Sequence, residues 1–106
     1  MMNMKIRIAG NTASPCYFAI KAKGYQVEIF SYLESEKENE WSFDYNATKD
    51  DLFFSATSPE ELLGLISMWE TRGDNWRANE KEADEYWDIT CNIPMYDRDG
   101  NLIENK

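Results

Sequence analysis

The stretch SPEELLGLISMWETRGDNW, residues 58–76, decides the fold predicted for this chain. Ser58 is an N-cap residue, Pro59 occupies the first helical position, and Glu61 completes a capping box three residues after the cap. Gly73 is the expected left-handed stop after the helix. Between them, apolar residues recur at three- and four-residue spacing, namely Leu62, Leu63, Leu65, Ile66, Met68 and Trp69. The pattern predicts a helix over residues 59–72 that packs on a sheet.

Alternating apolar and polar residues predict strands on both sides of this helix. They occur at residues 5–9, 25–33, 41–46, 52–56 and 86–95, and Leu102 with Ile103 allows a further short strand. The residues expected to face inward are Val27, Ile29, Leu33, Trp41, Phe43, Tyr45, Leu52, Phe54 and Ala56. Residues 16–23 also alternate and would form a hairpin with residues 25–33, although Ser14-Pro15 could instead begin a helix there.

These elements predict an α+β fold. It consists of an antiparallel sheet of about five or six strands packed against one main helix over residues 59–72. At 106 residues the chain is expected to form a single domain, residues 1–106, and its 42% hydrophobic content is enough for a packed core. Residues 34–40 are expected to form a charged loop, and residues 74–85 a loop or a short exposed helix.

The cysteines and the N-terminus indicate a cytoplasmic protein. Cys16 and Cys91 are the only cysteines, and two dispersed thiols in a reducing compartment are typically small buried hydrophobes. No apolar run follows the N-terminal residues, so no signal peptide is expected, and no stretch is apolar for long enough to cross a bilayer.

The net charge of −9 is unevenly distributed. Residues 1–33 carry Lys5, Arg7, Lys21 and Lys23 against Glu28, whereas the rest of the chain carries 7 basic and 19 acidic side chains. Such a surface repels nucleic acid and anionic membranes and attracts a basic protein partner. The same charge also fits plain solubility.

The absence of histidine argues against an enzyme. It removes Ser-His and Cys-His activation and the usual zinc ligands, and the neighbouring carboxylates have ordinary roles in helix starts, turns and solvated faces. We therefore predict no catalytic residue, no metal and no cofactor. Asp97, Asp99 and Asn101 resemble the start of a calcium loop, but Gly100 stands at the fourth position instead of the sixth, so a hairpin turn explains them more simply.

Two kinds of residue are candidates for binding a partner. Trp76 lies among polar residues, where it is either an interface anchor with Arg72, Asp74 and Arg77 as its polar rim or a lid folded on the helix end. The acidic candidates lie at residues 34–40 and 80–88, where a solvated surface is the alternative. They are Glu36, Glu38, Glu40, Glu82, Asp84 and Glu85.

The size, the acidity, the lack of catalytic motifs and the SPEELLGLISMWETRGDNW block together resemble the small acidic immunity proteins of bacterial toxin systems. The resemblance implies a cytoplasmic domain, often α+β, that neutralises a cognate toxin by occupying its basic cleft. It assigns no binding residue. Two other functions remain open: a small-molecule module with an apolar pocket between helix and sheet, and a subunit of an assembly joined at an open sheet edge.

Overall fold

The computed structural model describes residues 4–8 and 10–104. The chain divides into two compact units, Met1–Gly73 and Asp74–Lys106, which we call the first and the second unit. Among the described residues, no helix has both the length and the apolar character needed to cross a membrane.

The first unit contains a three-stranded antiparallel sheet, ordered β1-β2-β3. The strands are β1 (Gln26–Ser35), β2 (Glu40–Lys49) and β3 (Leu52–Ala56), which confirms the strands predicted from residues 25–33, 41–46 and 52–56. A turn over residues 36–39 joins β1 to β2, so the charged loop is also confirmed. Val27 lies opposite Ala47, which in turn lies opposite Phe54, and this register brings the core-forming residues of all three strands onto one face.

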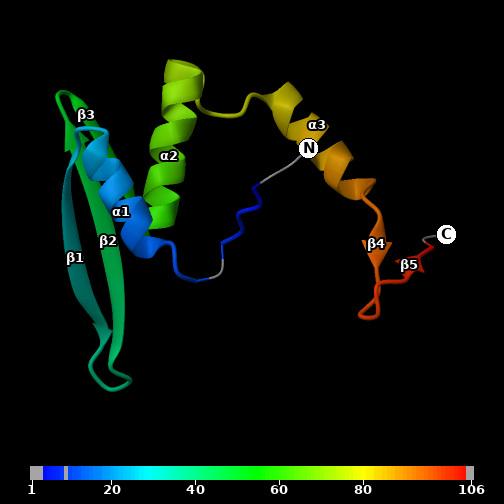
Figure 1. Cartoon of the computed structure of the whole chain (residues 1–106), viewed down its shortest axis with the longest axis horizontal. Helices are drawn as coiled ribbons and strands as arrows, with labels where there is room; N and C mark the ends of the chain where they lie inside the picture. The colour runs from blue at the N-terminus through cyan, green and yellow to red at the C-terminus, as the bar shows by residue number, and fades with distance from the viewer. Residues whose placement is uncertain (1–3, 9, 105–106) are drawn as a thin grey trace. The chain divides into compact units, whose positions relative to one another are not determined.

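Two helices, α1 (Ala13–Ala22) and α2 (Pro59–Arg72), cover part of that face (Figure 1). The core contains Ile20, Tyr25, Ala47, Phe54, Leu62 and Ile66. The predicted bounds of α2 are confirmed: the Glu61 backbone N–H donates to Ser58 Oγ at 3.1 Å, and Gly73 adopts a φ of 62° after the last turn. The Glu61 carboxylate accepts hydrogen bonds from the hydroxyls of Thr57 and Ser58, at 3.1 and 3.3 Å.

Residues 16–22 belong to helix α1 and Lys23 is its C-cap, so the helical alternative at Ser14-Pro15 is right and the predicted hairpin with residues 25–33 is wrong. In a stretch of eight residues, apolar residues that alternate as in a strand also fit the spacing of a helix. Ile20 is the buried residue of α1, so a single inward position is enough for this helix. Pro15 lies in the first turn, where a missing N–H costs no helical hydrogen bond. β1 therefore pairs with β2 alone within the described chain.

The strand predicted at residues 5–9 is not present over residues 5–8, which form neither helix nor strand, and residue 9 lies outside the described residues. Met4, Ile6 and Ile8 are strongly exposed, at 70%, 80% and 68%. The alternation is correct for a strand, but a strand also needs a neighbour to satisfy its backbone groups. None pairs with this segment in the described chain.

The second unit contains a helix and a small hairpin. After the short 3₁₀ turn η1 (Gly73–Asn75), which begins at the boundary of the units, come α3 (Glu80–Cys91), β4 (Met95–Tyr96) and β5 (Leu102–Ile103). The strand predicted at residues 86–95 is therefore wrong. The signal that decides it is the capping box of Asn79 and Glu82, which starts a helix that continues through the alternating residues.

The turn between β4 and β5 is built by Asp97, as the hairpin interpretation predicts. Its carboxylate accepts the backbone N–H groups of Asp99 at 3.0 Å and Asn101 at 2.8 Å. None of the described residues of this unit is buried. Cys91 is accordingly exposed and Cys16 half-buried, so the prediction of two buried thiols is wrong.

The α+β class is confirmed, but the sheet is smaller than predicted. Instead of about five or six strands in one sheet, the described residues form a three-stranded sheet and a separate two-stranded one. Instead of one main helix, they form three α-helices. The additional helices arise from the stretches at residues 16–23 and 86–95, where helix-start residues override a short alternation. The smaller sheet follows from the same two stretches and from residues 5–8, which form no strand.

Two glycines, one inside α2 and one at its end, predict opposite effects on stability. Gly64 lies inside the helix, and a Cβ added there meets no atom within 4 Å. We expect Gly64→Ala to raise the free energy of unfolding by about 0.5–1 kcal/mol, because alanine loses less backbone entropy on folding. Gly73 also has open space around it, but its φ of 62° and ψ of −139° disfavour an L side chain. We expect Gly73→Ala to lower the free energy of unfolding by about 1–3 kcal/mol.

Urea titration followed by circular dichroism measures both changes. Equal effects of the two substitutions would contradict the assignment, since an added Cβ meets no atom within 4 Å at either site and only Gly73 has a positive φ.

Candidate functional site

The most distinctive surface of the first unit is the free part of the β1–β2 hairpin. β1 and β2 have ten residues each, roughly 33 Å of strand. β3 pairs only with residues 45–49 of β2, so the hairpin has two strands over residues 30–44, and residues 28 and 29 of β1 lead into this part. We call residues 28–44 the arm. Figure 1 shows the hairpin turn extending past the ends of α1 and α2.

One face of the arm is apolar and uncovered. Its residues continue the face that carries the core, and they are Ile29, Leu33, Trp41 and Phe43, with exposed fractions of 50%, 42%, 51% and 45%. From the sequence, these residues are assigned to the face of the sheet that carries the core, which is correct. They are also expected to be covered, whereas they are exposed. The helices are too short to cover them, because 10 and 14 residues of helix span only about 15 and 21 Å.

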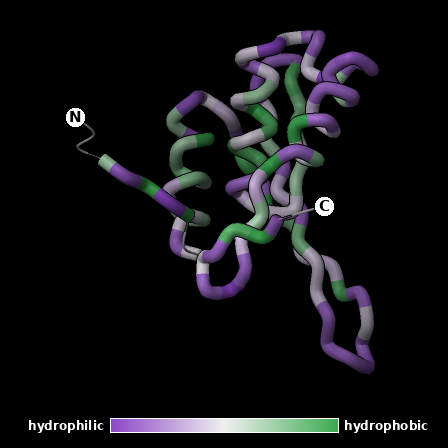
Figure 2. The backbone as a smooth tube through the Cα atoms, turned by 90° about the vertical axis from the view of Figure 1, so that its right-hand side faces the viewer, coloured by the Kyte–Doolittle hydropathy of each residue, from purple (hydrophilic) through white to green (hydrophobic). Residues whose placement is uncertain are grey.

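The tip of the arm is acidic. Glu36 and Glu38 lie in the turn, Glu40 begins β2, and all three are exposed, so the tip is hydrophilic in Figure 2. Trp41 lies next to these carboxylates, and its Nε1 donates to Asn39 Oδ1 at 3.1 Å. This bond holds the polar edge of the indole against the turn. The arm therefore presents an anchored aromatic ring beside three carboxylates.

The opposite face of the arm is mixed. Glu28, Glu34 and Asp44 lie on it with the aromatic residues Phe30 and Tyr32, which are 40% and 49% exposed. The hydroxyl of Ser42 donates to Glu34 Oε1 at 2.6 Å across the two strands. This face is the acidic side of the arm.

A groove lies where the arm leaves the helices. It has a volume of about 310 Å³, and its lining comes from the first half of α1, from β1 and β2, and from the start of α2: Ala13, Ser14, Tyr17, Phe18, Ile29, Tyr45 and Pro59. Phe18 is 60% exposed at its rim and meets Tyr17 edge to face, with ring centroids 5.0 Å apart. The groove can accept an apolar side chain next to the apolar face of the arm.

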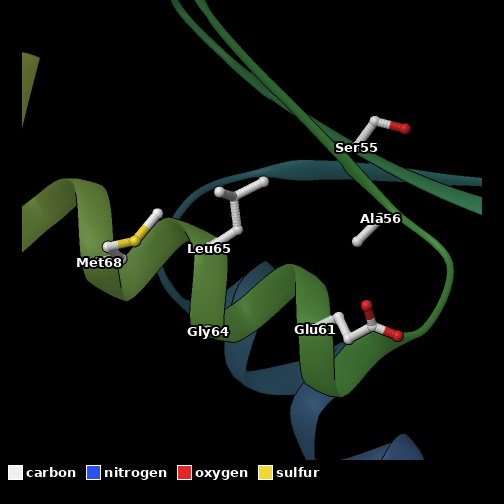
Figure 3. A pocket seen from close by; sticks show the side chains of 6 residues that line it. All are labelled: Ser55, Ala56, Glu61, Gly64, Leu65 and Met68. Carbon is white, nitrogen blue, oxygen red and sulfur yellow. The ribbon is translucent and has the colours of Figure 1, made fainter. Parts of the chain in front are cut away.

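A second depression, of about 390 Å³, lies between the end of β3 and α2 (Figure 3). Its lining residues are Ser55, Ala56, Glu61, Gly64, Leu65 and Met68. Glu61 is the charged group among them, and its carboxylate is already engaged by two hydroxyls. The depression thus offers apolar contact with little polar recognition, which limits its selectivity for a small molecule.

The predicted cluster around Trp76 is divided between the units. Arg72 ends α2 in the first unit, whereas Asp74, Trp76 and Arg77 belong to the second. Trp76 is half-buried, and the Arg77 guanidinium lies over its ring, 4.3 Å from the centroid. This stacking covers one face of the indole. The role of these four residues in binding stays a prediction.

The predicted acidic residues also fall on two separate elements. Glu36, Glu38 and Glu40 form the arm tip of the first unit, whereas Glu82, Asp84 and Glu85 lie on α3 of the second. Glu82 caps its own helix, because its carboxylate accepts the Asn79 N–H at 3.3 Å and its own N–H donates to Asn79 Oδ1 at 2.8 Å. Asp84 and Glu85 are exposed. Both acidic groups have exposed aromatic residues in their own unit: Trp41 and Phe43 for the arm tip, and Tyr86 and Trp87, 70% and 69% exposed, on α3. Each unit also has a depression, of about 310 Å³ in the first and about 260 Å³ in the second. The arm tip differs in that its carboxylates and aromatic residues lie on a two-stranded hairpin.

Two titratable groups in the first unit are shifted by burial. Burial raises the pKa of the Cys16 thiol, and the nearby Glu60 carboxylate raises it further. Burial also raises the pKa of the Tyr25 hydroxyl, reinforced by Glu70 and opposed by Lys23. Both groups are held in their neutral forms, in which a thiol is a weak nucleophile. Among residues 4–8 and 10–104, no group of three or more Cys, Asp or Glu side chains is placed to hold a metal ion.

Trp41 and Phe43 were assigned to the core and were not identified as candidates from the sequence, whereas Phe30 and Tyr32 were expected either to cover a second layer or to lie exposed on a protein-binding face, and they are exposed. The strand predicted at residues 41–46 was too short to reveal the exposure of Trp41 and Phe43, because β2 continues to Lys49 whereas the third strand, β3, has only five residues. A short third strand cannot support a core along the whole hairpin.

The chain matches no family model, and neither a curated protein nor a solved structure is similar to it.

Proposed function

We propose that this protein is a non-catalytic inhibitor that binds a basic protein through the arm. One observation carries the proposal: the apolar face with Trp41 and Phe43, and the carboxylates of Glu36, Glu38 and Glu40, lie on the same two-stranded arm. A partner that contacts the arm meets negative charge at the tip and an apolar strip behind it.

These two features contribute to binding in different ways. Exposed carboxylates steer a basic partner and speed association, but each contributes little affinity because water and salt screen it. Aromatic residues that become buried slow dissociation and carry most of the binding energy. The groove beside Phe18 extends this strip and can receive an apolar side chain of the partner.

The kind of partner that fits best is a toxin domain with a basic active-site cleft, as for the immunity proteins that the sequence resembles. A protruding hairpin can enter a cleft, where its carboxylates would occupy the position of a substrate phosphate. Inhibition would then be by occlusion, in the cytoplasm of the cell that makes both proteins. Nucleic acid and anionic membranes are not expected as partners, because the net charge of −9 repels them.

Affinity capture from the native cell tests this function. The full chain is immobilised, bound protein is identified by mass spectrometry, and the wash is repeated at rising salt concentration. We expect a basic protein that is retained at low salt and released more readily at high salt. Failure to retain any basic protein in washes from low to high salt would refute the proposal.

Charge removal at the tip tests whether the arm makes the contact. We expect the triple variant Glu36→Gln, Glu38→Gln, Glu40→Gln to slow association with the captured protein about ten-fold at low salt, because steering depends on local charge. The matched control removes three charges from α3, with Asp84→Asn, Glu85→Gln and Asp88→Asn. Surface plasmon resonance measures both rates. If the α3 variant has the larger effect, the contact lies on the second unit and not on the arm.

A further inference from the structure

The outer edge of β1 and residues 4–8 are two unpaired parts of the first unit that complement each other. Within the described part of the chain, β1 pairs with β2 alone, so its other edge is open along ten residues. Residues 4–8 belong to no helix or strand. An open sheet edge and an unpaired segment are the two components of a strand-addition interface.

Residues 4–8 have the pattern of a two-faced strand. Met4, Ile6 and Ile8 alternate with Lys5 and Arg7, so a strand would place three apolar side chains on one face and two cations on the other. The apolar side chains are 70%, 80% and 68% exposed. The single chain therefore leaves this apolar surface in water.

β1 carries the matching two faces. Ile29 and Leu33 lie on its apolar face, and Glu28 lies on its acidic face. Glu34 lies at the irregularity between Leu33 and Ser35 and shares the acidic face with Ser42, whose hydroxyl donates a hydrogen bond to its carboxylate. Because side chains alternate with a period of two, any pairing that places Ile6 on the apolar face also places Lys5 and Arg7 on the acidic face. A slip by one residue would place both cations on the apolar face. Lys5 and Arg7 are two residues apart and Glu28 and Glu34 are six apart, so a single register sets one cation directly opposite one glutamate while the apolar faces meet.

We propose that a second copy of this chain supplies the added strand: residues 4–8 of each protomer pair with the outer edge of β1 of the other. Every copy carries both components, so a two-fold dimer pairs both edges and leaves neither segment unpaired. Gly10, with a φ of 81° and open space around it, forms a bend between this segment and α1. The dimer does not depend on the proposed partner, since Trp41, Phe43 and the tip carboxylates are not on the outer edge of β1.

Charge exchange between two variants tests the dimer. The first variant is Lys5→Glu with Arg7→Glu, and the second is Glu28→Lys with Glu34→Lys. Alone, each variant places like charges together in both copies of the interface, and we expect its dimer to be weaker by about ten-fold or more. In an equimolar mixture, each interface again joins opposite charges, and we expect the dimer to return. Sedimentation equilibrium over a wide concentration range measures the masses, with far-UV circular dichroism as the check of folding.

A control and three results decide the outcome. The control, Asp84→Lys with Asp88→Lys on α3, changes the net charge as much as the second variant and should not reproduce the recovery on mixing. Recovery only in the mixture of the first two variants supports the proposal. A wild-type chain that is monomeric at every concentration overturns it, and hydrogen exchange then shows whether residues 4–8 are protected on their own β1. A dimer that neither variant weakens also overturns it, because its contact lies elsewhere.

Discussion

Leu62→Ala is expected to lower the free energy of unfolding by about 2–5 kcal/mol, a large part of the total stability of a domain of this size. Leu62 is fully buried on α2, in the cluster with Ile66 and Phe54. Truncation removes its apolar contacts and leaves a cavity that the surrounding strand and helix residues cannot fill, because the backbone of a sheet relaxes little. Chemical denaturation of the full chain measures the change.

The matched control is Leu65→Ala on the same helix. The chemical change and the helical context are identical, but Leu65 is only half-buried at the edge of the core. We expect its cost to be less than half that of Leu62→Ala, because fewer contacts are lost and water enters the space. Equal costs at the two sites would show that the core is not centred where α2 meets the sheet.

Trp41→Ala is expected to weaken binding of the basic partner by about 2 kcal/mol or more, roughly 30-fold, while changing stability by less than about 1 kcal/mol. The indole is 51% exposed on the arm, so the free protein gains little from it. Burial against a partner would remove that exposed apolar area from water. Isothermal titration calorimetry measures the affinity, and thermal unfolding measures the stability.

Phe53→Ala provides the comparison for this result. Phe53 is 63% exposed on β3, and its side chain lies on the sheet face opposite Trp41. We expect this substitution to leave affinity within about two-fold, since the face does not belong to the proposed contact. A larger loss from Phe53→Ala than from Trp41→Ala would move the binding surface to the other side of the sheet.

The parts of the fold that could be predicted are those where several local signals agree. For α2, the cap at Ser58, the apolar spacing and the stop at Gly73 all point to the same bounds, which the structure reproduces. The three strands of the first unit are long enough, or bounded clearly enough, for their alternation to be decisive. In each of these stretches the apolar residues fit either the helical period of 3.6 or the strand period of 2, and not both.

The prediction failed where the apolar residues of a stretch of about ten residues fitted the strand period of 2 and the helical period of 3.6 equally well. Residues 16–23 and 86–95 both alternate, yet both contain helix. The deciding residues lie outside the alternating stretch, with Ser14-Pro15 in the first turn of α1 and Asn79 before α3. Helix-start residues therefore carried information that the alternation alone did not. Residues 5–8 failed for another reason, because alternation predicts the shape of a strand but not the presence of its neighbour.

The candidate site was harder to predict than the fold. Acidic residues at 34–40 were identified from composition, but the apolar face behind them was assigned to the core. Strand patterns indicate which side chains share a face, and they do not indicate how far a covering helix extends along it. The exposure of Trp41 and Phe43 depends on that length difference.

The hairpin has a half that packs against the helices and a half, the arm, that extends beyond them. The residues that stabilise the fold and the residues proposed to bind a partner therefore lie in different halves. Substitutions on the arm lose few internal contacts, so its side chains are free to change while the packed half keeps the scaffold intact. A protein built this way can acquire a new specificity through a few surface replacements at almost no cost in folding.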